Sequence, residues 1–205
     1  VALEDPDWDF PYADQESAAR GVRLGVGRKM PRTHSVYERR VKWRSYEPHL
    51  LYGVATDMKN YKSAAGNEEQ IRAQFEAEEK EGLMLRRTWA EAKKEYGERL
   101  LIAAIAAMEK GDDSFRVLHD GTYGVRINPK VRVRDRQRMP TLAEQTVVVA
   151  EAVATRMPAF GLKGDVSKAH RRIRVARRDW GLQACQLDDS DEVWLNCVGT
   201  FGIAS

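Results

Sequence analysis

The sequence predicts an α+β fold in which short helices precede antiparallel hairpins. Asn67, Thr88 and Thr141 are each followed three positions later by Glu or Gln, a spacing typical of helix starts. Alternating apolar and polar residues flank acidic turns at 111–114 and 188–191, a pattern typical of hairpins. The chain has 205 residues and no internal repeat, a length that suits one good-sized domain.

The first two predicted helices follow directly from these starts. One helix is expected from Asn67 onward, with Ile71, Phe75 and Ala77 on its apolar side. A second, shorter helix is expected over residues 89–96, because a glycine follows it and suits a helix end.

The segment 100–110 allows two interpretations. Its content of Ala, Leu and Met favours a helix. The turn at 111–114 and the alternation over 115–120 instead favour a strand that belongs to a hairpin. Periodicity alone leaves both structures open.

The second half of the chain alternates between strand-like and helical patterns. A strand is expected over 125–133, and a helix from Thr141 to about Met157, with Val148, Ala152 and Thr155 on one side. A strand over 160–166 and a helical segment over 168–175 follow, the latter with Ala169 and Ile173 inside and its arginines outside. The last expected element is a hairpin of 182–187 with 193–198.

Charge is distributed unevenly along the chain. The net charge is only +3, but basic residues concentrate in the stretches 20–44, 126–138 and 163–178. Such stretches fit one positive face that contacts nucleic acid, and they also fit separate solvated faces.

Composition excludes several classes of protein. Cys185 and Cys197 are too few for a disulfide framework or a zinc site, and we expect buried free thiols in a reducing compartment. No apolar run approaches the ~20 residues of a membrane span, so no membrane partner is expected. No secretion signal is recognisable, which predicts an intracellular location in the cytoplasm or nucleus. The start at Val1 and the end at Ser205 predict a piece of a longer polypeptide.

Asp165 lies at the end of the expected strand 160–166 and before a basic turn. A carboxylate in that place could ligate Mg²⁺, which prefers oxygen donors, while Lys168 and Arg171 neutralise phosphate charge. Asp165 could equally cap the helical segment that follows, at its positive end. The residues alone leave both roles open.

Blocks of sequence in the second half of the chain resemble the fingers and the first palm motifs of reverse transcriptases, especially those of retrotransposons. Residues 106–110 with 115–120 and Ile127-Asn128 are similar to the fingers hairpin, 164–171 to the first catalytic motif, and 194–203 to the second palm motif with its Phe-Gly pair. The resemblance implies that 101–110 is a strand. It also implies a fingers-like region at 67–157 and a partial palm at 158–205. Residues 1–66 are rich in Arg, Lys, Pro and Gly, a composition that predicts a basic, partly irregular N-terminal arm.

The resemblance implies an RNA-directed DNA polymerase that transfers nucleotides with two Mg²⁺ ions. Asp165 would be the catalytic carboxylate and, with the backbone carbonyl of Val166, would hold the metal ions. Lys110 and Arg116 would bind the triphosphate of a deoxynucleoside triphosphate, since a guanidinium matches phosphate oxygens well. An RNA or DNA template-primer would be the other substrate.

Further residues complete the site that the resemblance implies. His170 stands where the family has Tyr or Phe beneath the sugar, a departure that puts sugar discrimination in question. Phe201 and Gly202 would shape the floor beneath the template base and the incoming nucleotide. Asp120 and Asn128 are expected to organise the fingers backbone rather than to take part in chemistry.

A larger departure concerns the metal site. The family completes it with two adjacent aspartates on a later hairpin, and residues 1–205 hold no such pair in that position. One carboxylate leaves two Mg²⁺ ions undercompensated. We therefore expect this chain to be inactive without the remainder of its parent polyprotein. The alternatives are a non-catalytic relic or nucleic-acid-binding module with this fold, and an unrelated basic α+β module in which Asp165 is only a cap.

Overall fold

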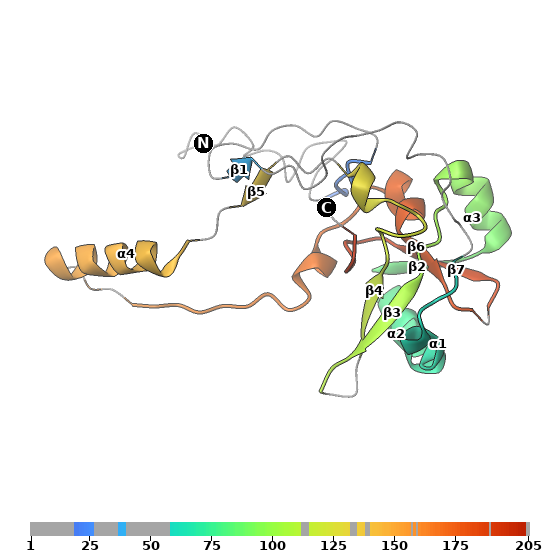
Figure 1. Cartoon of the computed structure of the whole chain (residues 1–205), viewed down its shortest axis with the longest axis horizontal. Helices are drawn as coiled ribbons and strands as arrows, with labels where there is room; N and C mark the ends of the chain where they lie inside the picture. Colours follow the sequence, from blue (N-terminus) through green and yellow to red (C-terminus); the bar gives the residue numbers. More distant parts are fainter. Residues whose placement is uncertain are drawn as a thin grey trace.

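The computed structural model describes residues 19–26, 37–39, 58–111, 115–131, 135–137, 140–156, 158, 160–188 and 190–203. These residues form short helices and antiparallel sheets, which confirms the α+β class (Figure 1). Much of the expected arm at 1–66 lies outside the described residues, so the division into arm, fingers and palm stays a prediction. None of the helices in these ranges is long and apolar enough to cross a membrane.

Helix α2 spans Glu68–Lys80, as the apolar spacing predicts. Ile71 and Phe75 are buried on its inner side, but Glu78 takes the third inward position and Ala77 is exposed. The expected cap is wrong: the Asn67 side chain donates to a carbonyl of the preceding one-turn helix α1 (Lys62–Ala65) and makes no cap bond.

Helix α3 spans Trp89–Tyr96, and its start is confirmed in detail. The backbone N–H of Thr88 donates to the Glu91 carboxylate at 2.9 Å, and the Glu91 N–H donates to the Thr88 hydroxyl at 3.3 Å. Gly97 closes the helix at φ +54°, in a region that side chains rarely adopt. A 3₁₀ turn, η3 (Gly97–Arg99), follows.

The central sheet has three antiparallel strands in the order β2–β7–β6. β6 (Ala184–Gln186) and β7 (Glu192–Asn196) form the expected hairpin. β2 (Met84–Thr88) was not predicted, because Met-Leu-Arg-Arg-Thr has no alternation of apolar and polar residues. Its full-length pairing with β7 stabilises it as a strand.

The hairpin interpretation of the Ala-rich segment is confirmed. β3 (Ile105–Glu109) pairs antiparallel with β4 (Phe115–His119), and the residues before β3 are buried and extended rather than helical. Ile102 forms a parallel bridge to Ala184 of β6, which joins the hairpin to the central sheet. Burial against that sheet overrides the local helix preference.

Other expected elements are wrong. The described part of 125–133 forms a 3₁₀ turn, η4 (Asn128–Lys130), instead of a strand. Residues 160–166 pair with no described strand and are exposed. The helical segment over 168–175 shrinks to η5 (Ala169–Arg172). Ala169 and Ile173 are exposed and Arg171 is buried, contrary to expectation, whereas Arg172 and Arg174 are exposed as expected. A longer 3₁₀ stretch, η6 (Arg177–Gln183), precedes β6.

The core lies around β7 and beneath α2. Trp194 of β7 is fully buried and its ring lies 5.4 Å from that of Phe75 on α2. Buried Asp179 of η6 attaches the segment 19–26 to this body, because it accepts hydrogen bonds from the Arg23 side chain at 2.7 Å and the Leu24 N–H at 3.0 Å.

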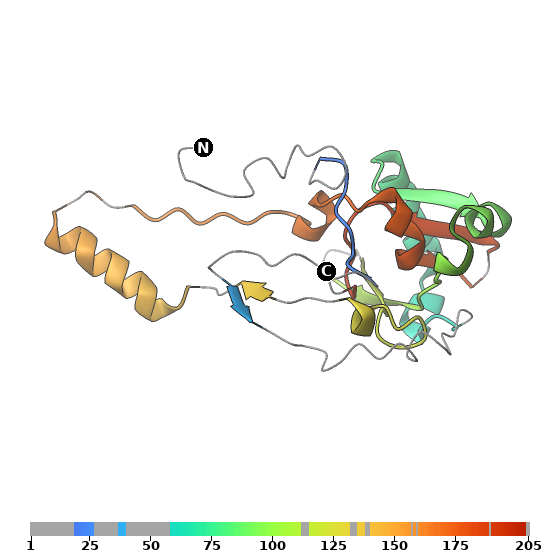
Figure 2. The same cartoon turned by 90° about the horizontal axis from the view of Figure 1, so that it is seen from above.

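Helix α4 (Leu142–Ala154) lies away from the body, at the far end of the extended segment 160–166 (Figure 1, Figure 2). The Thr141 N–H donates to the Glu144 carboxylate at 2.5 Å, as the predicted start requires. None of its side chains is buried, so the expected packing of Val148 is not observed. A small ribbon of β1 (Tyr37–Arg39) and β5 (Asp135–Gln137) also stands apart from the body (Figure 2).

Candidate functional site

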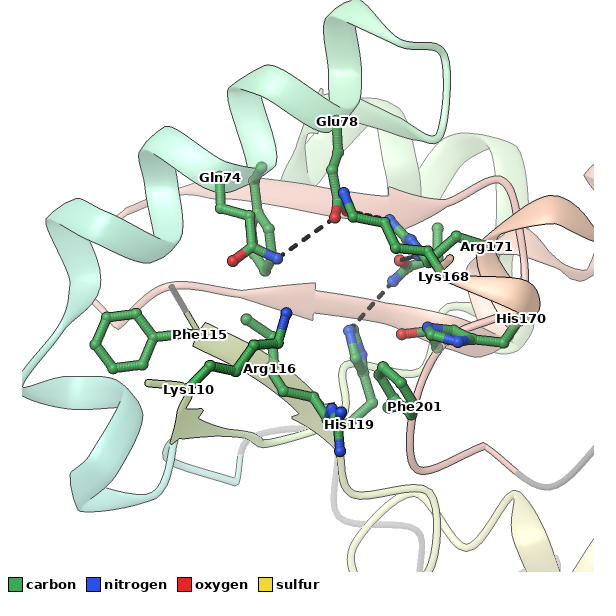
Figure 3. A pocket seen from close by; sticks show the side chains of 14 residues that line it. Gln74, Glu78, Lys110, Phe115, Arg116, His119, Lys168, His170, Arg171 and Phe201 are labelled. Carbon is green, nitrogen blue, oxygen red and sulfur yellow. Dashed lines mark hydrogen bonds and ion pairs between the residues drawn. The ribbon is translucent and has the colours of Figure 1, made fainter. Parts of the chain in front are cut away.

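A pocket lies between α2, the β3–β4 hairpin and the segments around η5 and after β7 (Figure 3). It holds about 440 Å³ of empty space, part of which is open to solvent. Its lining residues come from four stretches of the chain that are far apart in sequence: 74–78, 110–119, 168–171 and 196–201. The lining residues are Gln74, Phe75, Glu78, Lys110, Phe115, Arg116, Val117, His119, Lys168, His170, Arg171, Asn196, Thr200 and Phe201.

The lining is strongly cationic. Lys110 and Arg116 belong to the hairpin, whereas Lys168 and Arg171 reach the pocket from the opposite side (Figure 3). Glu78 is the only carboxylate among the described lining residues. A pocket lined by four basic side chains and one carboxylate attracts anions.

Phe201 lies against the side chains of His170 and Arg116. Its ring centroid is 3.6 Å from that of His170, and the Arg116 guanidinium carbon is 4.8 Å from it. Both contacts fix the ring at the edge of the pocket, and the second is a cation–π contact. This contact holds the exposed guanidinium of Arg116 beside the Phe201 ring at the pocket.

Close backbone packing sets the position of Phe201. The His119 N–H donates to the Phe201 carbonyl at 2.9 Å. A side chain at Gly202 would place its Cβ 1.9 Å from the His119 carbonyl oxygen, and Gly202 has φ +92°. Only glycine fits there, so Gly202 of the Phe-Gly pair is a steric requirement of this wall.

Arg171 is the buried centre of a polar network behind the pocket. One terminal nitrogen, Nη1, donates to Asn196 Oδ1 at 2.6 Å and to the Gly199 carbonyl at 3.3 Å. The other, Nη2, pairs with the Glu78 carboxylate. The pair links α2 to η5, and Asn196 links both to the central strand β7.

This network was not anticipated from the sequence. The sequence pattern places Arg171 on the outside of a helix and assigns no role to Glu78. A signal was present, because Ile71, Phe75 and position 78 share one helical face with the spacing i, i+4, i+7. A charged residue on a buried face predicts a buried partner.

Buried His119 and Gln183 complete the network. The Gln183 side chain donates to the carbonyls of Asn196 at 2.7 Å and Val198 at 2.9 Å, and the Asn196 amide donates back to the Gln183 carbonyl at 2.9 Å. His119 Nε2 lies 3.4 Å from Asn196 Nδ2. Burial, with a smaller contribution from the Arg171 charge, lowers the pKa of His119 to about 3.

His170 has a different environment from His119. It is about half-buried at the pocket edge, and its pKa is lowered by burial first and by the nearby Arg171 charge second. Arg116 and Lys168 lower it further, while Glu78 opposes them. His170 is therefore an uncharged aromatic ring at neutral pH, which suits a stacking contact.

Residues predicted to act together fall into two groups. Lys110, Arg116, His170 and Phe201 line the one pocket described above. Asp165, Val166 and Gly202 do not line it, and Asp165 is exposed on the extended segment 160–166. Since Asp165 is three residues before Lys168, their Cα atoms are within about 11 Å of each other.

The alternative role of Asp165 as a helix cap is wrong, because the residue at the start of η5 is Lys168 and no side chain caps that turn. Within the described ranges, no group of three or more His, Cys, Asp or Glu residues could hold a metal ion. The assignment of Asp165 and Val166 as Mg²⁺ ligands stays a prediction.

Asp120 and Asn128 organise backbone, as expected. Asp120 Oδ1 accepts from the N–H groups of Thr122 at 3.0 Å and Tyr123 at 2.9 Å. The Asn128 amide donates to the Gly202 carbonyl at 2.7 Å, which ties the loop after β4 to the Phe-Gly segment. Cys185 and Cys197 are buried free thiols, also as expected.

Comparison with known protein families finds no family that matches this chain, and no curated protein sequence matches it.

Proposed function

We propose that this chain is the fingers and part of the palm of an RNA-directed DNA polymerase, and that its basic pocket binds the triphosphate of a deoxynucleoside triphosphate. One observation carries the proposal. A single pocket is lined by Lys110, Arg116, His170 and Phe201. These residues belong to separate blocks of sequence that resemble reverse transcriptases.

The chemistry of the pocket supports a triphosphate as its ligand. Lys110 and Arg116 on one side and Lys168 on the other can neutralise several phosphate charges at once. The Arg116 guanidinium, held by Phe201, offers a planar pair of donors for two phosphate oxygens. The His170 and Phe201 rings supply an apolar edge for the sugar and base.

Metal chemistry would belong to the complete polymerase. The Asp165 carboxylate and the Val166 carbonyl are the oxygen donors that Mg²⁺ takes, and they would align a primer hydroxyl with the nucleotide. One exposed carboxylate does not balance two divalent ions. Nucleotidyl transfer is thus proposed for the parent protein, with its template-primer, and this chain alone is expected to be inactive.

A second candidate is a nucleic-acid-binding module without catalysis. It is favoured by the exposure of Asp165 and by its absence from the pocket lining. In such a module the same cations would contact the phosphates of a polynucleotide instead of a mononucleotide.

Calorimetric titration of the chain with dTTP in the presence of Mg²⁺ tests the proposal. We expect saturable binding that Arg116→Ala weakens by about tenfold or more, because charge-assisted hydrogen bonds are lost. Lys94→Ala is the matched control, since Lys94 is an exposed cation on α3 and does not line the pocket. An unchanged dTTP affinity in Arg116→Ala contradicts the proposal.

Competition separates the two candidates. If single-stranded RNA binds and dTTP does not compete with it, the non-catalytic module is the better account. Primer extension by this chain alone, lost in Asp165→Asn, would show that the expectation of inactivity is wrong.

A further inference from the structure

Two buried side-chain nitrogens of residues that line the pocket have no hydrogen-bond partner among the described residues: Nδ1 of His119 and Nε of Arg171. His119 is 3% exposed and Arg171 is 6% exposed. Both residues line the pocket. Buried polar groups are nearly always paired, so two unpaired groups at one cavity indicate a site for an acceptor.

The neighbouring contacts fix the proton of His119 on Nδ1. Asn196 Oδ1 accepts from Arg171 at 2.6 Å, which places the Asn196 NH₂ group towards His119. An NH₂ group donates, so His119 Nε2 must be the acceptor in that contact. The neutral ring then carries its hydrogen on Nδ1, and that nitrogen is a donor.

We propose that His119 Nδ1–H and Arg171 Nε–H form an inner subsite that binds an oxygen of the phosphate chain in the pocket. Lys110 and Arg116, which are exposed, form the outer part of the same site. The inference rests on the proposed function only in taking the phosphate chain to be that of a nucleotide.

The two parts of the site differ in how they bind. Lys110 and Arg116 attract the ligand by charge. The charge of Arg171 is largely offset by Glu78, and His119 is neutral at the pH of the cell, so the inner subsite contributes directed hydrogen bonds. Buried donors of this kind discriminate strongly between ligands that offer an acceptor and ligands that do not.

A matched pair of substitutions at position 119 tests the subsite. In His119→Asn the amide lies where Nδ1 was, so a donor to the pocket is retained and the contact to Asn196 is lost. In His119→Gln the amide lies nearer to the place of Nε2, so the contact to Asn196 is retained and the donor is lost. We expect His119→Gln to weaken binding of inorganic tripolyphosphate about tenfold, and His119→Asn to stay within about threefold.

A purely structural role for His119 predicts the opposite order, because the structural contact is the one through Nε2. That order, or equal affinities of both variants and the unchanged chain, overturns the proposal. Thermal unfolding of each variant checks that it is folded. Arg171→Lys gives a second measurement if either is not, because it keeps the charge against Glu78 and lacks Nε–H. Undiminished tripolyphosphate binding by Arg171→Lys would also overturn the proposal.

The outcomes for the two proposals are separable. If the chain binds tripolyphosphate in a His119-dependent way and does not bind dTTP, the inner subsite stands and the polymerase proposal fails. If Arg116→Ala weakens dTTP binding and His119→Gln does not, the polymerase proposal stands and the inner subsite fails.

Discussion

At the scale of single residues, burial rather than residue type decides what the basic groups of the pocket do. His119 and His170 are both near Arg171, but only His119 is fully buried, and the pKa of His119 falls to about 3. Arg116 remains exposed and available to a ligand, whereas the two terminal nitrogens of Arg171 are paired with Glu78 and Asn196.

The low pKa of His119 makes stability depend on pH. The folded value of about 3 lies below the ~6.5 of an unfolded histidine, so between these values the unfolded chain binds more protons. The contribution of neutral His119 to the free energy of unfolding is fully present above pH 6.5, and it is lost as the pH falls towards 3. From pH 7 to pH 5 the free energy of unfolding should fall by about 2 kcal/mol for this reason.

Urea unfolding at pH 7 and pH 5 measures this effect, with His119→Gln as the comparison because glutamine does not titrate. The pH-dependent loss should be about 2 kcal/mol smaller in the variant. His170 titrates in both proteins, so its contribution cancels. Equal losses in the two proteins would mean that His119 becomes protonated within the folded chain.

At the scale of elements, those marked by local signals could be predicted and those made by distant partners could not. The start of α3 is set by Thr88 and Glu91, three residues apart, and it was predicted to the residue. β2 exists because it pairs with β7, more than a hundred residues later, and its own residues carry no strand pattern. Residues 160–166 show the converse case. Their apolar pattern predicts a strand, but no described strand pairs with them.

The candidate site divides in the same way. The sequence predicts four residues of the pocket, because the blocks that contain them resemble a known family: Lys110, Arg116, His170 and Phe201. It does not predict Glu78, His119 and Asn196, because their roles depend on contacts that span up to about half of the chain.

The buried pair of Glu78 and Arg171 joins α2 to η5, and its loss should affect the whole body. Glu78→Ala leaves the Arg171 charge buried without its partner, which should lower the free energy of unfolding by about 3–5 kcal/mol. Glu76→Ala is the matched control on the same helix, because the Glu76 side chain is only half-buried and its carboxylate is 3.9 Å from Nη1 of Arg86. It should cost no more than about 1 kcal/mol.

Urea unfolding of both variants gives these differences. The double substitution Glu78→Leu with Arg171→Met removes both charges, so it should be less destabilised than Glu78→Ala alone. A Glu78→Ala protein as stable as the Glu76→Ala control would show that the pair does not hold α2 on the body.

At the scale of the whole molecule, stability is concentrated in the body that carries the pocket. α2 buries Ile71, Phe75 and Glu78, whereas α4 buries nothing among the described residues. The extended segment 160–166 is likewise exposed, with Phe160 at 92% and Leu162 at 90%. Large exposed apolar side chains are unfavourable in water, so this part of the chain gains little from its structure.

Hydrogen exchange should therefore differ sharply between two helices of equal length. α2 and α4 have 13 residues each. Isolated helices of this length are marginal in water, so the α4 amides should exchange almost as fast as those of an unfolded peptide, while α2 is protected by burial. Mass spectrometry of peptides covering 68–80 and 142–154 compares them within one sample. Equal protection would mean that α4 is covered in solution, and a loss of that protection on dilution would identify a second copy of the chain as the cover.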